Sequence, residues 1–133
     1  MILVDTSVMI NYLKDIDNRN TKRFMDVLDR ELPFGINNFI YQELLQGCRT
    51  DKDFRLLKKY LEGQKFYDFK NDRESYADAA MIYFNLRKKG ITIRSTIDCL
   101  IAQIAMENDL YLLHDDIDFT RMSEVIPLKI WGT

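Results

Sequence analysis

Short apolar runs alternate with longer stretches of helical periodicity along this chain. The run Ile2-Leu3-Val4 is continuously apolar, which is typical of a strand buried in a parallel sheet. Further short strands are predicted within residues 33–36, 65–69, 110–113 and 125–128; the segment 65–69 is more polar and is expected nearer a sheet edge. Strands that alternate with helices predict an α/β domain with a mostly parallel sheet.

Helices are predicted between these strands, where apolar residues recur every three or four positions. The expected helices cover residues 8–13, 21–30, 39–46, 51–62, 72–89 and 96–105. The longest, 72–89, carries Tyr76, Ala80 and Phe84 four residues apart, and we expect this stripe to face the core or a subunit interface. The acidic segment 114–119 is predicted as a turn.

Polar residues at the predicted helix starts indicate caps. Thr6 or Ser7 can cap the first helix, and Asn37 or Asn38 can cap the third. Gly47 follows the third helix and is expected at the C′ position, just beyond its last turn.

The helix that begins after Ser95 has an acid in its first turn. Ser95 stands at the N-cap position, and Asp98 follows three residues later. Asp98 is either a capping acid favoured by the positive end of the helix or a metal-binding carboxylate held rigidly there. This segment alone leaves both readings open. The apolar stripe of the helix is Ile97, Leu100, Ile101 and Ile104.

Composition indicates one globular domain spanning residues 1–133. Hydrophobic residues make up 47% of the chain and charged residues 30%, and this length can bury a hydrophobic core. The net charge of −2 argues against a protein that passively coats nucleic acid, because such proteins are usually basic. It does not argue against an enzyme whose acidic pocket meets phosphate through metal ions.

The sequence also bears on compartment. Its apolar runs are shorter than the ~20 residues that a membrane helix needs, so we expect no membrane association. The first residues lack the basic region of a signal peptide. Cys48 and Cys99 have no CxxC spacing and are interpreted as buried thiols in a reducing compartment. We therefore expect a cytoplasmic protein.

Acidic residues follow two of the predicted strands. Asp5 comes directly after the first strand, and Asp115, Asp116 and Asp118 follow the strand at 110–113. In open parallel sheets, ligands bind beyond the carboxyl ends of strands where the strand order reverses. These acids can share such a crevice, or they can be helix caps and a solvated turn.

Glu43 adds a further carboxylate, since it lies within or beside the apolar stripe of its helix. A carboxylate there is costly unless it is paired or bound to a cation, although a surface glutamate at the stripe margin remains possible. Several carboxylates in one pocket repel each other unless a divalent cation neutralises them, and oxygen-only ligands favour Mg²⁺ or Mn²⁺. Phosphodiester hydrolysis is the chemistry that uses such a site.

Four segments together resemble PIN-domain ribonucleases, and more narrowly the VapC toxins of toxin–antitoxin modules. They occur in the family's order and span nearly the whole chain. The segments are Val4-Asp5-Thr6-Ser7, Gln42-Glu43-Leu44-Leu45-Gln46-Gly47, Arg94-Ser95-Thr96-Ile97-Asp98-Cys99-Leu100-Ile101-Ala102 and Leu113-His114-Asp115-Asp116-Ile117-Asp118-Phe119.

The resemblance implies catalytic carboxylates at Asp5, Glu43, Asp98 and Asp116. It implies that Asp5, Asp98 and Asp116 hold one or two Mg²⁺ or Mn²⁺ ions, with metal-activated water as the nucleophile. It further implies endonucleolytic cleavage of RNA that leaves 5′-phosphate ends. Asp118 is a supporting acid by the same resemblance.

The resemblance also implies a fold and partners. The fold is a three-layer α/β/α domain whose five-stranded sheet has the order 3-2-1-4-5. The partners are the RNA substrate, a second copy of the chain in a homodimer, and a VapB-like antitoxin. The tail of such an antitoxin enters the active-site groove with a basic residue, which would neutralise the carboxylates there.

Four further residues lie in or beside these segments: Thr6, Ser95, Arg94 and His114. Thr6 and Ser95 either orient carboxylates or serve as ordinary caps. Arg94 precedes the acidic helix and can grip a substrate phosphate. His114 stands where relatives commonly carry Thr or Ser, and it is interpreted as a turn residue or a group beside the acids, since no catalytic-triad motif surrounds it.

Other functional classes fit less well. A phospho-acceptor signalling domain would have paired acids at the end of its first strand, and an aspartyl phosphatase would have a second Asp at position 7, where this chain has Ser7. A PIN-like binding module without catalysis is the remaining alternative, and the four acidic positions argue against it.

Overall fold

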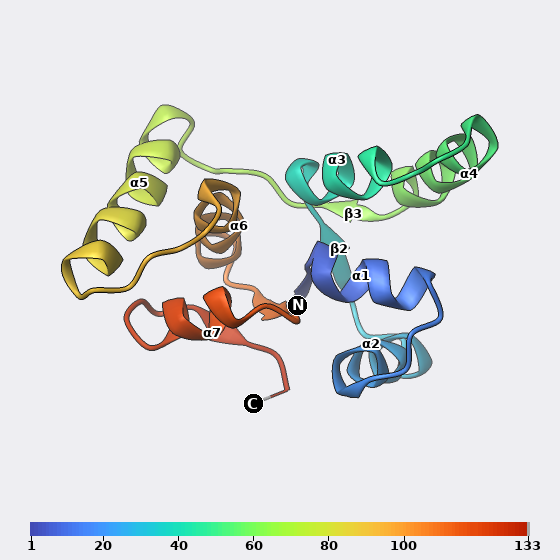
Figure 1. Ribbon diagram of the computed structural model, residues 1–133, viewed down its shortest axis with the longest axis horizontal. Helices are drawn as coiled ribbons and strands as arrows, with labels where there is room; N and C mark the ends of the chain where they lie inside the picture. The colour runs from blue at the N-terminus through green and yellow to red at the C-terminus, as the bar shows by residue number, and fades with distance from the viewer. Residues whose placement is uncertain (133) are drawn as a thin grey trace.

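The computed structural model describes residues 1–132 and shows a five-stranded sheet in which all pairings are parallel (Figure 1). The strand order is β3-β2-β1-β4-β5, which confirms the prediction. At the centre, Ile2 lies opposite Phe34 on one side and Tyr111 on the other. The strands are β1 (Ile2–Val4), β2 (Phe34–Ile36), β3 (Lys65–Phe66), β4 (Tyr111–Leu113) and β5 (Lys129–Ile130).

Two sets of helices flank this sheet (Figure 1). One set is linked by contacts of α1 with α2 and α3, and of α3 with α4; the other is linked through α6, which contacts α5 and α7. The helices are α1 (Thr6–Leu13), α2 (Arg19–Asp29), α3 (Asn38–Gln46), α4 (Asp51–Glu62), α5 (Arg73–Lys88), α6 (Thr96–Glu107) and α7 (Ile117–Ser123). None of the helices described is long and apolar enough to cross a membrane.

The sheet is buried, as its continuous apolar runs predict. Every residue of β1 is at most 2% exposed, and the last two residues of β4 are fully buried. Phe24 of α2 packs edge-on against Tyr12 and Phe34, with ring centroids 4.9 and 5.3 Å apart. The carboxyl ends of β1 and β4 lie side by side, because Val4 pairs with Leu113.

The region after β4 differs from the prediction in two ways. The predicted turn 114–119 contains the start of α7, whose N-cap is Asp116. Phe119 and Met122, three residues apart, are fully buried, and each burial contributes about 1.5–3 kcal/mol. The predicted strand 125–128 is wrong: β5 lies at Lys129–Ile130, because the N–H groups of residues 125 and 126 bond to the Met122 carbonyl.

The predicted stripe of the longest helix does not face the core, so of the two expected surroundings the subunit interface stays a prediction. Tyr76 and Phe84 are 51% and 43% exposed. The buried face of α5 instead carries Ser75, Ala79, Ile82 and Leu86. Small residues on this face let α5 pack closely against α6. Both faces recur at the three- or four-residue spacing of a helix, so periodicity alone does not distinguish them.

The helix ends refine the expected caps. Asp5, rather than Thr6 or Ser7, is the N-cap of α1, whereas Asn37, one of the two residues predicted for that position, caps α3. Gly47 is the C-cap of α3 with φ −80°, so it is not the left-handed residue that a C′ glycine usually supplies. Left-handed backbone occurs instead at Gly90, with φ +79°, after α5.

Candidate active site

Asp5 follows β1 and is 5% exposed. Its Oδ2 accepts hydrogen bonds from the Ser7 N–H (3.0 Å) and the Ser7 hydroxyl (2.6 Å), while the Asp5 N–H donates to the Leu113 carbonyl (2.9 Å). Burial, together with the negative charge of Glu43, raises the pKa of Asp5 to about 6, although the bonds from Ser7 oppose this. The side chain is therefore a rigidly held carboxylate at the junction of β1 and β4.

Asp98 lies in the first turn of α6, where Ser95 is the N-cap and accepts a hydrogen bond from the Ile97 N–H (3.2 Å). Burial and, to a smaller extent, the charges of four neighbouring carboxylates together raise the pKa of Asp98 to about 7. Those neighbours are Asp5, Asp116, Asp118 and Glu43. The other three acids of the predicted catalytic set, Asp5, Glu43 and Asp116, thus all lie close enough to Asp98 for their charges to act on it.

Arg94 pairs with the two acids that follow β4. Its Nη2 donates to Asp116 Oδ1 (3.0 Å), and its Nε donates to Asp118 Oδ2 (3.1 Å). The Arg94 N–H also donates to Asp118 Oδ2 (3.3 Å), and these carboxylates raise the pKa of the Arg94 guanidinium. Arg94 was predicted to bind substrate; in this structure its guanidinium is a counter-ion of the acidic cluster.

The donor set fits a hard divalent cation. Carboxylate oxygens of Asp98, Asp116 and Asp118 lie within 4.8 Å of one another. Asp118 is 1% exposed, and within the described chain its Oδ1 accepts no hydrogen bond, although Arg121 Nη1 lies 3.9 Å away. A buried carboxylate oxygen without a donor is costly, and Mg²⁺ or Mn²⁺ would supply the missing partner.

This group of three differs in one member from the predicted metal ligands, which are Asp5, Asp98 and Asp116. Asp118, predicted as a supporting acid, belongs to the group. Asp5 does not, but its negative charge helps to raise the pKa of Asp98. The reason is α7: Asp116 caps this helix and accepts the Asp118 N–H (2.9 Å), which brings both side chains to the same end of the helix.

Glu43 reaches the cluster from α3 and is half-buried. The Thr6 hydroxyl donates a hydrogen bond to Glu43 Oε1 (3.1 Å) across 37 residues of sequence. Thr6 therefore orients a carboxylate, which is one of its two predicted roles. The hydrogen bond that Ser95 accepts from the Ile97 N–H is that of an ordinary N-cap.

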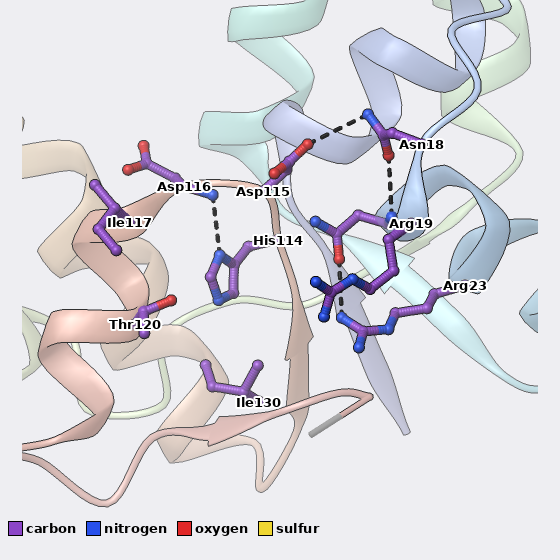
Figure 2. A pocket seen from close by; sticks show the side chains of 10 residues that line it. Asn18, Arg19, Arg23, His114, Asp115, Asp116, Ile117, Thr120 and Ile130 are labelled. Atoms are coloured by element: carbon purple, nitrogen blue, oxygen red, sulfur yellow. Dashed lines mark hydrogen bonds between the residues drawn. The ribbon is translucent and has the colours of Figure 1, made fainter.

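A cavity of about 540 Å³ opens beside the carboxylates (Figure 2). Asp115 and Asp116 lie at one rim, His114 lines the middle, and Arg19 and Arg23 lie on the other side. The sequence reasoning missed both arginines. The one available signal was the polar run Asn18-Arg19-Asn20 at a helix start, which is common without function.

His114 forms part of the cavity wall in one defined tautomer. It is 8% exposed, and its Nδ1 accepts the Asp116 N–H (3.1 Å), so the proton of the neutral ring resides on Nε2. Burial lowers the pKa of His114, and the charge of Arg23 lowers it further, while Asp116 and Asp115 oppose the change. His114 is thus a neutral donor beside the acids.

The fold and site together define a class: a small parallel α/β domain whose carboxylates converge beyond the carboxyl ends of its central strands. Residues 2–125 match the family model of the PIN domain, so the chain belongs to the PIN-domain family. This confirms the family to which the four ordered segments pointed.

Two proteins similar to this chain are VapC ribonucleases. The chain is 28% identical over 130 residues to Ribonuclease VapC11 of Mycobacterium tuberculosis, with 97% of this chain and 96% of that protein covered. The same figures apply to VapC ribonuclease Mb1587 of Mycobacterium bovis.

Solved structures agree on the fold. VapBC2 from Rickettsia felis, bound to a DNA fragment from its promoter, matches with a TM-score of 0.72 at 20% identity, covering 99% of this chain and 100% of that one. FitAcB from Neisseria gonorrhoeae matches with a TM-score of 0.70 at 21% identity, covering 99% and 97%.

Proposed function

We propose that this protein is a metal-dependent endoribonuclease and the toxin of a VapBC-type toxin–antitoxin module. One observation carries the proposal: Asp98 is half-buried among Asp5, Glu43, Asp116 and Asp118, and burial together with the charges of these four acids raises its pKa. Such a cluster is unfavourable as a set of bare anions and favourable around a divalent cation. The VapC ribonuclease relatives support the same activity.

Asp98, Asp116 and Asp5 would hold Mg²⁺ or Mn²⁺, with Asp118 in support. When bound, the ion supplies an activated water and offsets the negative charge that develops during phosphodiester cleavage. Ser7 fixes the Asp5 carboxylate through two hydrogen bonds, and Thr6 fixes Glu43 Oε1. Glu43 can then accept a proton at a carboxylate oxygen within the same cluster.

Arg94 has a defined part in this scheme. Without a divalent ion, its guanidinium neutralises Asp116 Oδ1 and Asp118 Oδ2. Its side chain is 72% exposed, so it is free to leave these oxygens and meet a substrate phosphate. This retains the predicted substrate-binding role for Arg94 and adds a role as counter-ion.

The proposed partner is a VapB-type antitoxin, since the solved neighbours include VapBC assemblies. A groove of about 820 Å³ between α1 and α4 suits an amphipathic segment of such a partner, because it is lined by exposed apolar side chains. These include Leu13, Leu56 and Tyr60, which are 43%, 58% and 41% exposed. A basic residue of the antitoxin would then reach the carboxylates and displace the metal.

The remaining parts of the proposal concern assembly and setting. We propose that residues 1–133 act as a single PIN domain, that the chain forms a homodimer, and that it works in the cytoplasm on RNA. The exposed aromatic side chains Tyr76 and Phe84 of α5 give the dimer an apolar surface that does not overlap the α1–α4 groove.

The test is a brief pulse of expression followed by mapping of cleaved RNAs, with and without co-expressed antitoxin. We expect new 5′-phosphate ends at a defined set of sites, and we expect the antitoxin or the Asp98→Asn substitution to suppress them. Growth and RNA that are unaffected by the free protein would contradict the toxin assignment.

A further inference from the structure

The cavity beside the carboxylates has opposite charges on its two sides. Asp115 and Asp116 line the side toward the acidic cluster, whereas Arg19 and Arg23 of α2 line the other (Figure 2). Among the described residues neither arginine has a carboxylate within ion-pair distance, although the chain carries more acids than bases. Two guanidinium groups that have no ion-pair partner among residues 1–132 and lie beside a cavity favour an anionic ligand.

Arg23 is held in place by its surroundings. Its Nη1 donates to Asn20 Oδ1 (3.0 Å), one turn earlier on α2. Its Nε and Cδ pass so close to Gly132 that a Cβ there would lie 2.6 and 2.8 Å from them, and Gly132 has φ +88°. The guanidinium of Arg23 is therefore partly preorganised, which lowers the entropy lost when it binds a ligand.

A second cavity, of about 520 Å³, continues on the other side of the same two arginines. It is lined also by Lys22, Asp26, Arg30 and Trp131. Arg30 pairs with Asp26 (3.1 Å) and Lys22 with Asp17 (3.9 Å), so among the described residues the positive charge without an ion pair here is that of Arg19 and Arg23, on a surface that ends beside the ring of Trp131. Cations that follow a groove with an aromatic ring beside them are typical of surfaces that bind single-stranded nucleic acid.

His114 joins this surface to the acidic cluster. Because its Nδ1 accepts the Asp116 N–H, its Nε2–H is the group available to a ligand in the cavity. Its ring is fixed by packing against Phe119, with ring centroids 5.3 Å apart. Because the His114 ring is neutral, it can donate a hydrogen bond to a phosphate or a base edge without placing a further charge beside the carboxylates.

We propose that the His114–Arg19–Arg23 cavity is a binding subsite for the RNA strand that flanks the cleaved bond, with its phosphates on the two arginines and a hydrogen bond from His114 Nε2–H. This subsite rests on the proposed ribonuclease function, and it directs the strand from the carboxylates along α2 toward Trp131. The acidic side of the cavity belongs to the reaction centre, and the basic side binds the product strand or substrate strand that extends from it.

The experiment measures binding without cleavage. Asp98→Asn protein is titrated into a fluorescein-labelled single-stranded RNA of mixed sequence, and anisotropy is followed over a range of salt concentrations. The Arg19→Gln/Arg23→Gln double variant is compared with Arg55→Gln/Arg73→Gln, which removes the same charge from exposed positions on α4 and α5.

We expect the Arg19/Arg23 variant to bind about tenfold more weakly, with the slope of log affinity against log salt reduced by about 1.4, since each phosphate contact to a single strand contributes about 0.7. The Arg55/Arg73 control should remain within about twofold of the parent protein, because nonspecific attraction from distant exposed charges is screened. His114→Asn, which keeps an acceptor for the Asp116 N–H, should weaken binding without changing the salt slope.

Because Arg23 is half-buried, Arg19→Gln alone is a second variant that leaves the packing intact. Its expected effect is a slope reduced by about 0.7. Equal binding by the Arg19/Arg23 variant and the control would overturn the subsite, as would an absence of RNA binding by the parent protein. Wild-type protein that binds RNA through these arginines but never cleaves it would support the subsite and contradict the ribonuclease function.

Discussion

Replacing Asp98 by Asn should stabilise the metal-free protein, and more so at high pH. The pKa of Asp98 is raised from 3.8 to about 7, chiefly by burial and then by neighbouring carboxylates. One pKa unit corresponds to about 1.4 kcal/mol, so the full shift is worth about 4 kcal/mol. Screening by solvent at this half-buried position reduces the effect to about 2 kcal/mol.

The direction follows from the raised pKa. The folded protein holds the Asp98 proton more tightly than the unfolded chain, so stability is complete below about pH 4 and is lost as the pH rises through about 7. Asn carries no charge and avoids this loss. At about pH 5 roughly one third of the loss has developed, so the gain from Asp98→Asn should be larger at about pH 8 by on the order of 1.3 kcal/mol.

The assay is urea unfolding in EDTA at both pH values, with Asp53→Asn as the matched control. Asp53 occupies the same position relative to its cap in α4 as Asp98 does in α6, but it is exposed. The control should show no gain at either pH. A gain from Asp98→Asn that is equal at the two pH values, or a loss of stability at the higher one, would refute the reasoning that Asp98 is crowded by carboxylates.

Arg94→Gln should lower the melting temperature in EDTA and enlarge the rise caused by Mn²⁺, because it leaves Asp118 without its cation; equal Mn²⁺-induced shifts in both proteins would contradict this. Thr6→Val should reduce kcat/KM on the order of tenfold, as expected when a hydrogen bond to the charged Glu43 is lost, while Thr6→Ser restores it. Phe84→Glu should convert a dimer to a monomer by light scattering, since Phe84 is 43% exposed; an unchanged mass would place the dimer surface elsewhere.

Much of the fold could be predicted because β1 and β4 are continuous apolar runs that only a covered parallel sheet accommodates. The positions of Asp5 and Asp116 at the carboxyl ends of these strands follow directly from that topology. Glu43 could be singled out because a carboxylate beside an apolar stripe needs a partner, and the structure supplies Thr6.

The rest depended on contacts between distant segments. The pairing of Arg94 with Asp116 and Asp118 spans more than twenty residues, and the orphan oxygen of Asp118 depends on how α7 packs. On α5, the exposed face that contains Tyr76 and the buried face that contains Ala79 both have helical spacing. Only tertiary packing therefore determines which face contacts α6. The arginines of α2 could not be identified as candidate site residues from the sequence, because only the folded structure shows that they lie across a cavity from His114.

Binding of a divalent ion by these carboxylates and cleavage of RNA should be lost together when Asp5 is replaced. Purified wild-type protein and Asp5→Asn are incubated with RNA in Mn²⁺ or in EDTA, while Mn²⁺ binding to each is followed by calorimetry. We expect cleavage with 5′-phosphate ends only by wild type in Mn²⁺, together with much weaker Mn²⁺ binding by Asp5→Asn. Cleavage that persists in EDTA, or that survives the Asp5 substitution with Mn²⁺ binding unchanged, would contradict metal-dependent catalysis at these carboxylates.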